Sequence, residues 1–175
     1  MDGCDALALH EAFVQGDLEA VKALLGNPSG FPNCTAPIGM GCIVLEYAIY
    51  HGPFPFIETL LDLGADPDYP DHVGYPSLIA ALSSGRQDRL QILDLLLAHG
   101  ADIQQHGANG YTPLHWAAGE DDPQLIDWLL ARGADPDAQT NVDDYTTPLE
   151  EAAILGKERA ASALRAVVGR KVNPD

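Results

Sequence analysis

Histidine is the residue type in this chain with the widest chemical range, because imidazole can bind a metal or transfer a proton near neutral pH. The six histidines are His10, His51, His72, His99, His106 and His115. No two of them stand four residues apart, and none lies in an HExxH or HxH motif. The spacing therefore predicts no metal site.

The acidic and serine-containing segments that could do chemistry also lack the context that such chemistry needs. Glu120-Asp121-Asp122 and Asp143-Asp144 could attract calcium, but the ligand spacing of an EF-hand loop is missing, so we interpret both runs as solvated turns. Ser83-Ser84-Gly85 does not form a nucleophile elbow, and no glycine-rich phosphate loop followed by a lysine is present. We therefore expect no enzymatic activity and no cofactor.

The chain is strongly acidic, with 26 Asp and Glu against 9 Lys and Arg and a net charge of −17. No Lys or Arg lies between Lys22 and Arg86, and the segment from Glu120 to Glu151 has Arg132 as its only cation. Such a surface repels phosphate, so we expect neither nucleic acid nor an anionic membrane as a partner. The charge indicates either a basic protein partner or solubility alone.

The cysteines and the chain start point to the compartment. Cys4, Cys34 and Cys42 are odd in number and match no zinc motif, which is typical of a reduced environment. The acidic start of the chain lacks a basic segment followed by an apolar run, so no signal peptide is expected. No apolar stretch reaches the length of a membrane span. These features predict a cytoplasmic protein.

A repeat of about 33 residues organises the elements of the chain. Leu9, Leu45, Leu78, Leu114 and Leu149 each open a helical segment, and Leu45 and Leu78 are 33 positions apart (45 to 78). Leu-rich segments end in Gly-Ala-Asp at residues 64–66, 100–102 and 133–135. Within one unit, Thr112-Pro113 favours a helix start and Gly133 a left-handed helix end. The pattern predicts pairs of helices joined by extended turns.

The segment from Gly110 to Asp135 carries the pattern G-x-T-P-L-H-x-A-A and a closing L-L-x-x-G-A-D. In this it resembles the ankyrin repeat family. The resemblance implies an all-α ankyrin-repeat solenoid of about five helix-turn-helix units joined by extended hairpin turns. We also expect a single domain over residues 1–175 and a monomer. The units are expected at about residues 5–33, 39–72, 74–106, 107–139 and 142–175.

Three segments depart from the regular repeat. The Pro- and Gly-rich segment from Asn27 to Gly41 is too long for a tight turn, so we expect an elaborated loop. About three extra residues lie around Gly85 to Arg89. The helix expected from Lys157 to Val168 is charged and Ala-rich, as a terminal repeat requires.

Tyrosines recur beside the predicted turns, at Tyr75, Tyr111 and Tyr145. By the resemblance, this position projects toward a concave groove, where a stripe of tyrosines would suit a protein interface. The alternative is that each ring only packs on the neighbouring turn. The other residues that the same mapping places in the groove are Tyr50, His51, His72, Val73, Ser83, Ser84, Ala108, Asn109, Gly119, Glu120 and Asp143.

Two further pairs of residues are expected to serve the fold. Trp116 and Trp128 are expected in the core. His10 and His115 stand at the position where, by the resemblance, the ring hydrogen-bonds within the stack.

The predicted function is non-enzymatic protein binding, in which electrostatic attraction of a basic partner is followed by burial of tyrosine and apolar groups. Two alternatives stay open. One is an immunity-type inhibitor that blocks a cationic toxin, and the other is a structural scaffold subunit of a multiprotein complex. The sequence does not distinguish them, because repeat surfaces are adapted one by one.

Overall fold

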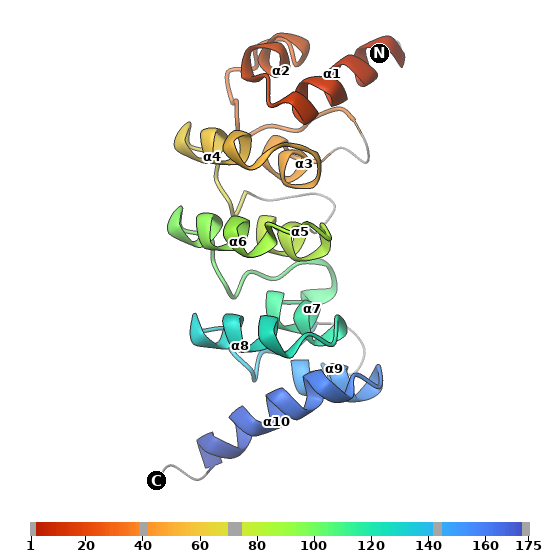
Figure 1. Cartoon of the computed structure of the whole chain (residues 1–175), viewed down its shortest axis with the longest axis vertical. Coiled ribbons are helices and arrows are strands. Elements are labelled where there is room, and N and C mark those ends of the chain that lie inside the picture. The colour runs from red at the N-terminus through yellow and green to blue at the C-terminus, as the bar shows by residue number, and fades with distance from the viewer. Residues whose placement is uncertain (1–2, 39–41, 70–74, 142–144, 173–175) are drawn as a thin grey trace. The chain divides into compact units, whose positions relative to one another are not determined.

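The computed structural model describes residues 3–38, 42–69, 75–141 and 145–172, with backbone alone at 3–5 and 168–172. Within these residues the chain is all-α and contains no named strand, only an isolated bridge between Thr35 and Ile43. The predicted all-α repeat fold is confirmed (Figure 1). The helices are α1 (Gly3–Gln15), α2 (Leu18–Leu24), α3 (Val44–His51), α4 (Phe54–Asp62), α5 (Ser77–Ser83), α6 (Arg89–Ala98), α7 (Pro113–Gly119), α8 (Pro123–Ala131), α9 (Pro148–Ile154), α10 (Glu158–Val172) and the 3-10 turn η1 (Ala108–Gly110).

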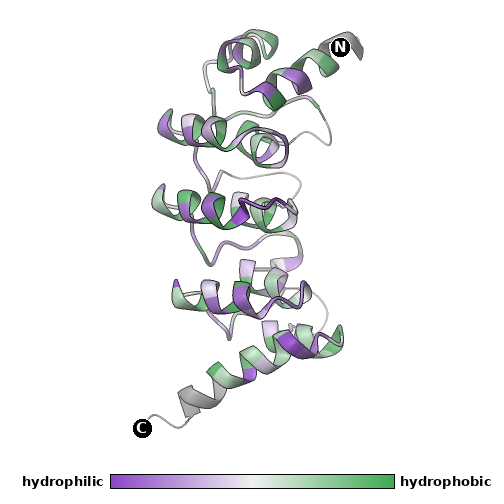
Figure 2. Ribbon diagram, viewed as in Figure 1, coloured by the Kyte–Doolittle hydropathy of each residue, from purple (hydrophilic) through white to green (hydrophobic). Residues whose placement is uncertain are grey.

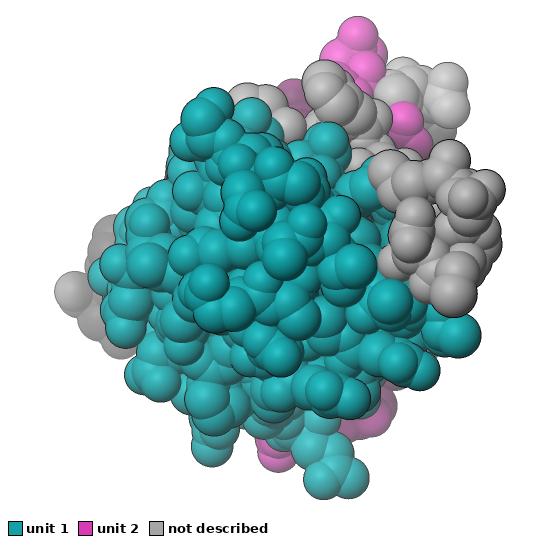
Figure 3. Space-filling view, turned by 90° about the horizontal axis from the view of Figure 1, so that it is seen from above, with its two compact units in different colours: residues 1–101 teal, residues 102–175 magenta. Residues whose placement is uncertain are grey.

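The chain divides into two compact units, Met1–Ala101 and Asp102–Asp175, which Figure 3 colours separately. Unit 1 holds the pairs α1–α2, α3–α4 and α5–α6, and neighbouring pairs contact each other through α1 and α3, α3 and α5, and α4 and α6. Unit 2 holds α7–α8 and α9–α10, which contact each other through α7 and α9 and through α8 and α10. The single domain and the repeat boundaries expected from the sequence stay predictions.

Side-chain caps start the inner helices of unit 2. The hydroxyl of Thr112 accepts a hydrogen bond from the backbone N–H of His115. In return, the backbone N–H of Thr112 donates to the ring of His115. Thr147 and Glu150 form the same reciprocal pair at the start of α9. In both helices a proline follows the threonine, where its missing N–H costs nothing. The Thr-Pro dipeptides therefore set where α7 and α9 begin.

Gly110 is required by both its conformation and its surroundings. Its φ is +75°, a left-handed backbone conformation that residues other than glycine adopt only at a cost in energy. A Cβ at this position would lie 2.6 Å from the backbone nitrogen of Asn141. The close approach brings the turn before α7 against the turn before α9, where the N–H of Asn141 donates to the carbonyl of Asn109.

Leucine, isoleucine and small alanines fill the cores. Hydrophobic and hydrophilic residues alternate along the helices (Figure 2). In unit 1 the fully buried side chains include Phe13, Ile49, Ile57, Leu60, Leu78, Ile92 and Leu96. In unit 2 they include Ala117, Ala118, Leu129, Ala152, Ala160 and Leu164. Alanines at the contacts let neighbouring helices approach closely.

The expectation that both tryptophans lie in the core is wrong. Trp116 and Trp128 are half-buried. Leu125, Ile126 and Leu129 already occupy the buried side of α8, so Trp128 lies at its margin. There the guanidinium of Arg132 stacks on its ring, 3.7 Å from the ring centre.

Candidate functional site

In unit 1, the predicted groove residues at the ends of α3 and α5 contact one another. The hydroxyls of Tyr50 and Ser83 are 2.7 Å apart, and the hydroxyl of Ser84 donates to the carbonyl of Ala81. The pKa of Tyr50 is raised, mainly because the phenol is buried, and the hydrogen bond to Ser83 partly opposes this rise. The structure thus brings Tyr50 and Ser83 together across neighbouring repeats and leaves both half-buried.

His51 lies in a group of rings on the same side of unit 1. Its ring centre is 5.2 Å from that of His10 and 4.4 Å from that of Tyr47. Desolvation and the neighbouring His10 both lower the pKa of His51. The Nδ1 of His10 lies 2.8 Å from the hydroxyl of Tyr47, so the predicted hydrogen-bonding role of His10 is confirmed.

In unit 2, the tyrosine at the predicted groove position is tied to the interior. The hydroxyl of Tyr111 donates to the carboxylate of Glu151, which is nearly buried and also accepts from the hydroxyl of Thr146. Burial, followed by the bond and the charge of Glu151, raises the pKa of Tyr111 to about 12. The hydroxyl of Tyr111 therefore serves the contact between two repeats, and the ring of Tyr111 is half-buried.

His115 has the internal role expected for it. The N–H of Thr112 donates to Nδ1 at 3.2 Å, which places the ring proton on Nε2, and Nε2 donates to the carbonyl of Thr146 at 2.9 Å. Burial lowers the pKa of His115, because the charged ring is disfavoured in the core. This histidine links α7 to the turn before α9.

The other predicted groove residues differ in exposure. Tyr145 is 60% exposed and adopts a φ of +50°, Asn109 is exposed with a φ of +60°, and Glu120 is exposed. Tyr75 is half-buried. Ala108 is exposed and Gly119 half-buried, whereas His72, Val73 and Asp143 lie outside the described residues.

Sequence reasoning missed two exposed apolar residues at the end of α9. Ile154 is 66% exposed and Leu155 is 50% exposed. They stand at the same distance from Leu149 as Gly119 and Glu120 do from Leu114. The signal was present, because the mapping that gave the groove positions of the other units places Ile154 and Leu155 there too.

The segment from Asn27 to Gly41 is described as far as Ile38 and is fastened to the next repeat. The amide of Asn33 donates to the carbonyl of Gly64 and accepts from the N–H of Asp66, at 2.9 and 2.8 Å. Gln104 makes the same two bonds in unit 2, to Gly133 and Asp135. One polar side chain thus fixes the turn that follows each of two outer helices, α4 and α8.

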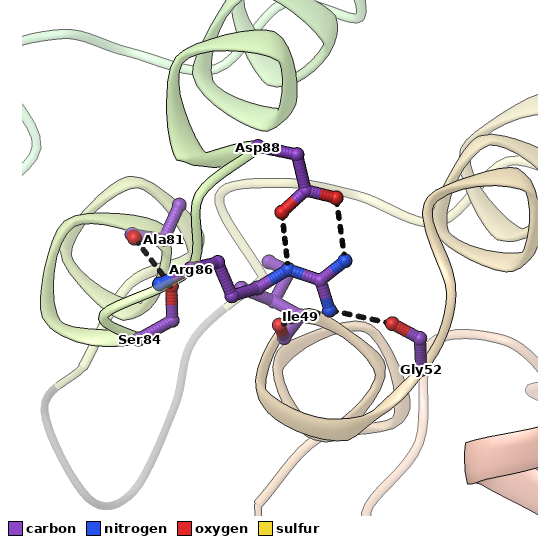
Figure 4. Close-up of polar contacts among 6 residues, drawn as sticks. All are labelled: Ile49, Gly52, Ala81, Ser84, Arg86 and Asp88. Carbon is purple, nitrogen blue, oxygen red and sulfur yellow. Dashed lines mark hydrogen bonds and ion pairs between the residues drawn. The ribbon is translucent and has the colours of Figure 1, made fainter.

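The insertion in the third repeat supplies a structural arginine. Arg86 donates two hydrogen bonds of 2.7 Å to Asp88 and one of 2.6 Å to the carbonyl of Gly52 (Figure 4). A longer bond of 3.3 Å reaches the carbonyl of Ile49. The guanidinium caps the end of α3, where unpaired carbonyls favour a cation. The hydrogen bonds from Arg86 lower the pKa of Asp88.

A family model described as ankyrin repeats (3 copies) matches residues 45–140 and 78–174. The two matches together span residues 45–174, which is more than half of the 175 residues. The chain belongs to the ankyrin repeat family. The repeats of this family are modules for protein–protein interaction, and this ankyrin repeat chain is one as well.

Several characterised proteins are similar to it. The target of rapamycin complex 2 subunit AVO2 of Saccharomyces cerevisiae is 32% identical over 133 residues, which are 74% of this chain and 30% of that protein. Protein phosphatase 1 regulatory subunit 27 of Mus musculus is 37% identical over 76 residues, or 43% of this chain and 49% of that protein. The E3 ubiquitin-protein ligase KEG of Arabidopsis thaliana is 30% identical over 146 residues, or 78% of this chain and 9% of that protein. The chain spans less than half the length of each of these relatives.

Metal binding and membrane insertion can each be compared with the residues that the structure describes. Among the described residues, no three His, Cys, Asp or Glu side chains are grouped so that they could hold a metal ion. Within the same residues, no helix combines the length and the apolar character that crossing a membrane requires.

Proposed function

We propose that this ankyrin repeat protein is a non-enzymatic adaptor that binds a basic protein segment through the ends of its inner helices and the adjoining turns. The observation that carries the proposal is the family itself, together with the acidic surface that the chain adds to it. Glu120 and Tyr145 are exposed, and Arg132 is the only cation between Glu120 and Glu151. A long-range negative field of this kind accelerates the encounter with a cationic partner.

Two of the similar proteins are a complex subunit and a regulatory subunit by name. This favours a role as a subunit of a larger assembly over the role of an inhibitor that acts alone. A partner that copurifies at fixed stoichiometry would support the subunit role. A cytoplasmic location and a monomeric state are part of the proposal.

The test of the proposed surface is a charge change at one place only. Glu120→Gln and Glu58→Gln remove the same charge, but Glu58 is exposed on the outer helix α4. For a partner recovered from native cells, we expect Glu120→Gln to slow association several-fold at low salt and Glu58→Gln to change it little. Equal effects of the two variants on the association rate would contradict the proposal.

The aromatic part of the proposal has its own test. Tyr75→Ala combined with Tyr145→Ala is expected to weaken the partner by about 2 kcal/mol, because truncation of tyrosine anchors typically costs this much. Tyr69→Ala, outside the predicted set, serves as the control for general effects of losing a tyrosine. An unchanged dissociation constant for the double variant would show that the rings only pack on their turns.

A further inference from the structure

The end of α9 carries an apolar surface that the rest of unit 2 does not bury. Ile154 and Leu155 are 66% and 50% exposed. A Cβ built on Gly119 would lie 3.9 Å from Cδ1 of Leu155, so Leu155 lies beside a position without a side chain. We call Gly119, Ile154 and Leu155 the α9 ledge.

The corresponding positions in other repeats are filled differently. In unit 1 they hold Tyr50 and His51 at the end of α3, and Ser83 and Ser84 at the end of α5. The hydroxyls of Tyr50 and Ser83 contact each other there. The α9 ledge instead offers two branched aliphatic side chains beside a glycine. An exposed pair of this kind, at the positions that the repeat mapping places in the groove, leaves apolar surface that a partner's apolar group could bury.

The charge around the α9 ledge is uneven. On one side Glu120 follows Gly119 directly, and the sequence from Asp102 to Glu151 contains Arg132 as its only cation. On the other side, the start of α10 mixes Lys157 and Arg159 with Glu158. Unit 2 thus carries a run of acids, Glu120-Asp121-Asp122, between α7 and α8, and exposed apolar side chains followed by residues of mixed charge at the end of α9.

We propose that the α9 ledge binds an apolar anchor side chain of a basic protein segment, whose Lys or Arg residues lie toward Glu120. The proposal rests on the proposed protein-binding function and adds the kind of partner and its direction. Packed helices lie about 10 Å apart, and an extended chain advances about 3.3 Å per residue. The anchor and the first cation of the partner are therefore separated by about three residues.

The test uses the whole chain and a labelled synthetic peptide, acetyl-Leu-Phe-Gly-Ser-Lys-Lys-Arg-amide, read by fluorescence anisotropy. We expect Ile154→Ser to weaken this peptide about ten-fold, as loss of an apolar anchor does. The control Leu90→Ser removes an aliphatic side chain that is 44% exposed on α6, in unit 1, and is expected to leave the affinity unchanged. A second peptide with Ser-Ser in place of Leu-Phe is expected to bind weakly and equally to all three proteins.

The contrary results separate the anchor proposal from the proposed function. Equal binding of the two peptides, an equal loss with Leu90→Ser, or no binding of the first peptide would overturn the anchor proposal. The proposed function would stand in these cases if the native partner still responds to Glu120→Gln and not to Glu58→Gln. Sedimentation that shows a dimer of the chain, abolished by Ile154→Ser, would also overturn it, because the α9 ledge would then bind a second copy.

Discussion

His115 combines burial with three polar contacts, and its protonation is the step that disturbs them. Its Nδ1 accepts from the N–H of Thr112, and a proton on that nitrogen removes the acceptor. The ring is fully buried, so the chain gains no solvent contact in exchange. Protonation of His115 therefore removes one hydrogen bond of the cap at the start of α7 and destabilises that end of the helix.

We expect unit 2 to lose stability through His115 as the pH falls below about 6.5, toward the lowered pKa of the folded ring. The pKa of the folded ring is lowered by burial from its ordinary value of 6.5. Above that value the ring is neutral in both states and stability is unaffected. Below it the unfolded chain takes up more protons, so stability falls until the pH has passed the folded pKa.

The measurement is the midpoint of urea unfolding as a function of pH, together with the proton NMR titration of the ring. The variant His115→Gln is expected to be less stable at neutral pH by about 1–2 kcal/mol and to show a flatter dependence over this range. An NMR titration of the His115 ring at or above the unfolded value would contradict the prediction.

The bond from Tyr111 to Glu151 gives a second titration at the residue scale. The pKa of Tyr111 is raised to about 12, by burial first and by Glu151 second. The stability that it reflects is present below the unfolded value of 10 and is lost as the pH rises through the folded pKa. We expect Glu151→Gln to lower the pKa of Tyr111 without restoring the value of 10, because burial remains. Absorbance at the phenolate band, with Tyr111→Phe as the blank, measures it.

Among the elements, the turns after α4 and α8 each depend on one amide side chain from the preceding turn. Asn33→Ala is expected to cost about 1–2 kcal/mol, because two hydrogen bonds are lost. Gln104→Ala should cost a similar amount in unit 2. Hydrogen exchange gives the specific readout: the N–H of Asp66 should lose protection in the first variant and that of Asp135 in the second. Loss of protection at both amides in either variant would mean that the effect is global.

The end of α3 depends in the same way on Arg86. Arg86→Ala removes the fork to Asp88 and the bond to Gly52, and we expect a loss of about 2 kcal/mol after allowance for partial exposure of the pair. Arg86→Lys keeps the positive charge but not the paired hydrogen bonds to Asp88, so the stability of this variant should lie between that of the wild-type protein and that of Arg86→Ala. Arg165→Ala, at an exposed position of α10, is the control. Calorimetric melting that ranks Arg86→Lys below Arg86→Ala would contradict the capping role.

The sequence was sufficient for the helices and insufficient for the contacts between them. Thr112-Pro113 and Gly133 predicted the limits of α7 and α8, because caps and left-handed glycines act locally. The partnership of Tyr111 with Glu151 spans 40 positions, and no local pattern specifies such a pair. The tryptophans were misplaced for a related reason: apolar spacing says which residues favour burial, not which are left at the margin once leucines fill it.

At the scale of the whole molecule, the net charge of −17 and the isoelectric point near 4.3 mean that the folded chain repels itself at neutral pH. Salt screens this repulsion over a Debye length of about 10 Å at 0.1 M. We therefore expect the melting temperature to rise by a few degrees between about 20 mM and 500 mM sodium chloride at neutral pH. A fall over the same range would show that attractive pairs such as Arg86 and Asp88 outweigh the general repulsion.

Some hydrogen bonds between repeats join a helix to a residue that is synthesised well after it. Arg86 belongs to the repeat that follows α3 and caps the end of that helix. Thr146 belongs to the repeat that follows α7, and its carbonyl accepts a hydrogen bond from His115 of α7. A chain leaving the ribosome exposes α3 before Arg86, and α7 before Thr146. Each of these helices emerges before the residue that completes its hydrogen bonds, which follows 34 positions after Gly52 in the first case and 31 positions after His115 in the second. We therefore expect each of these helices to reach its full stability only after the following repeat has been translated.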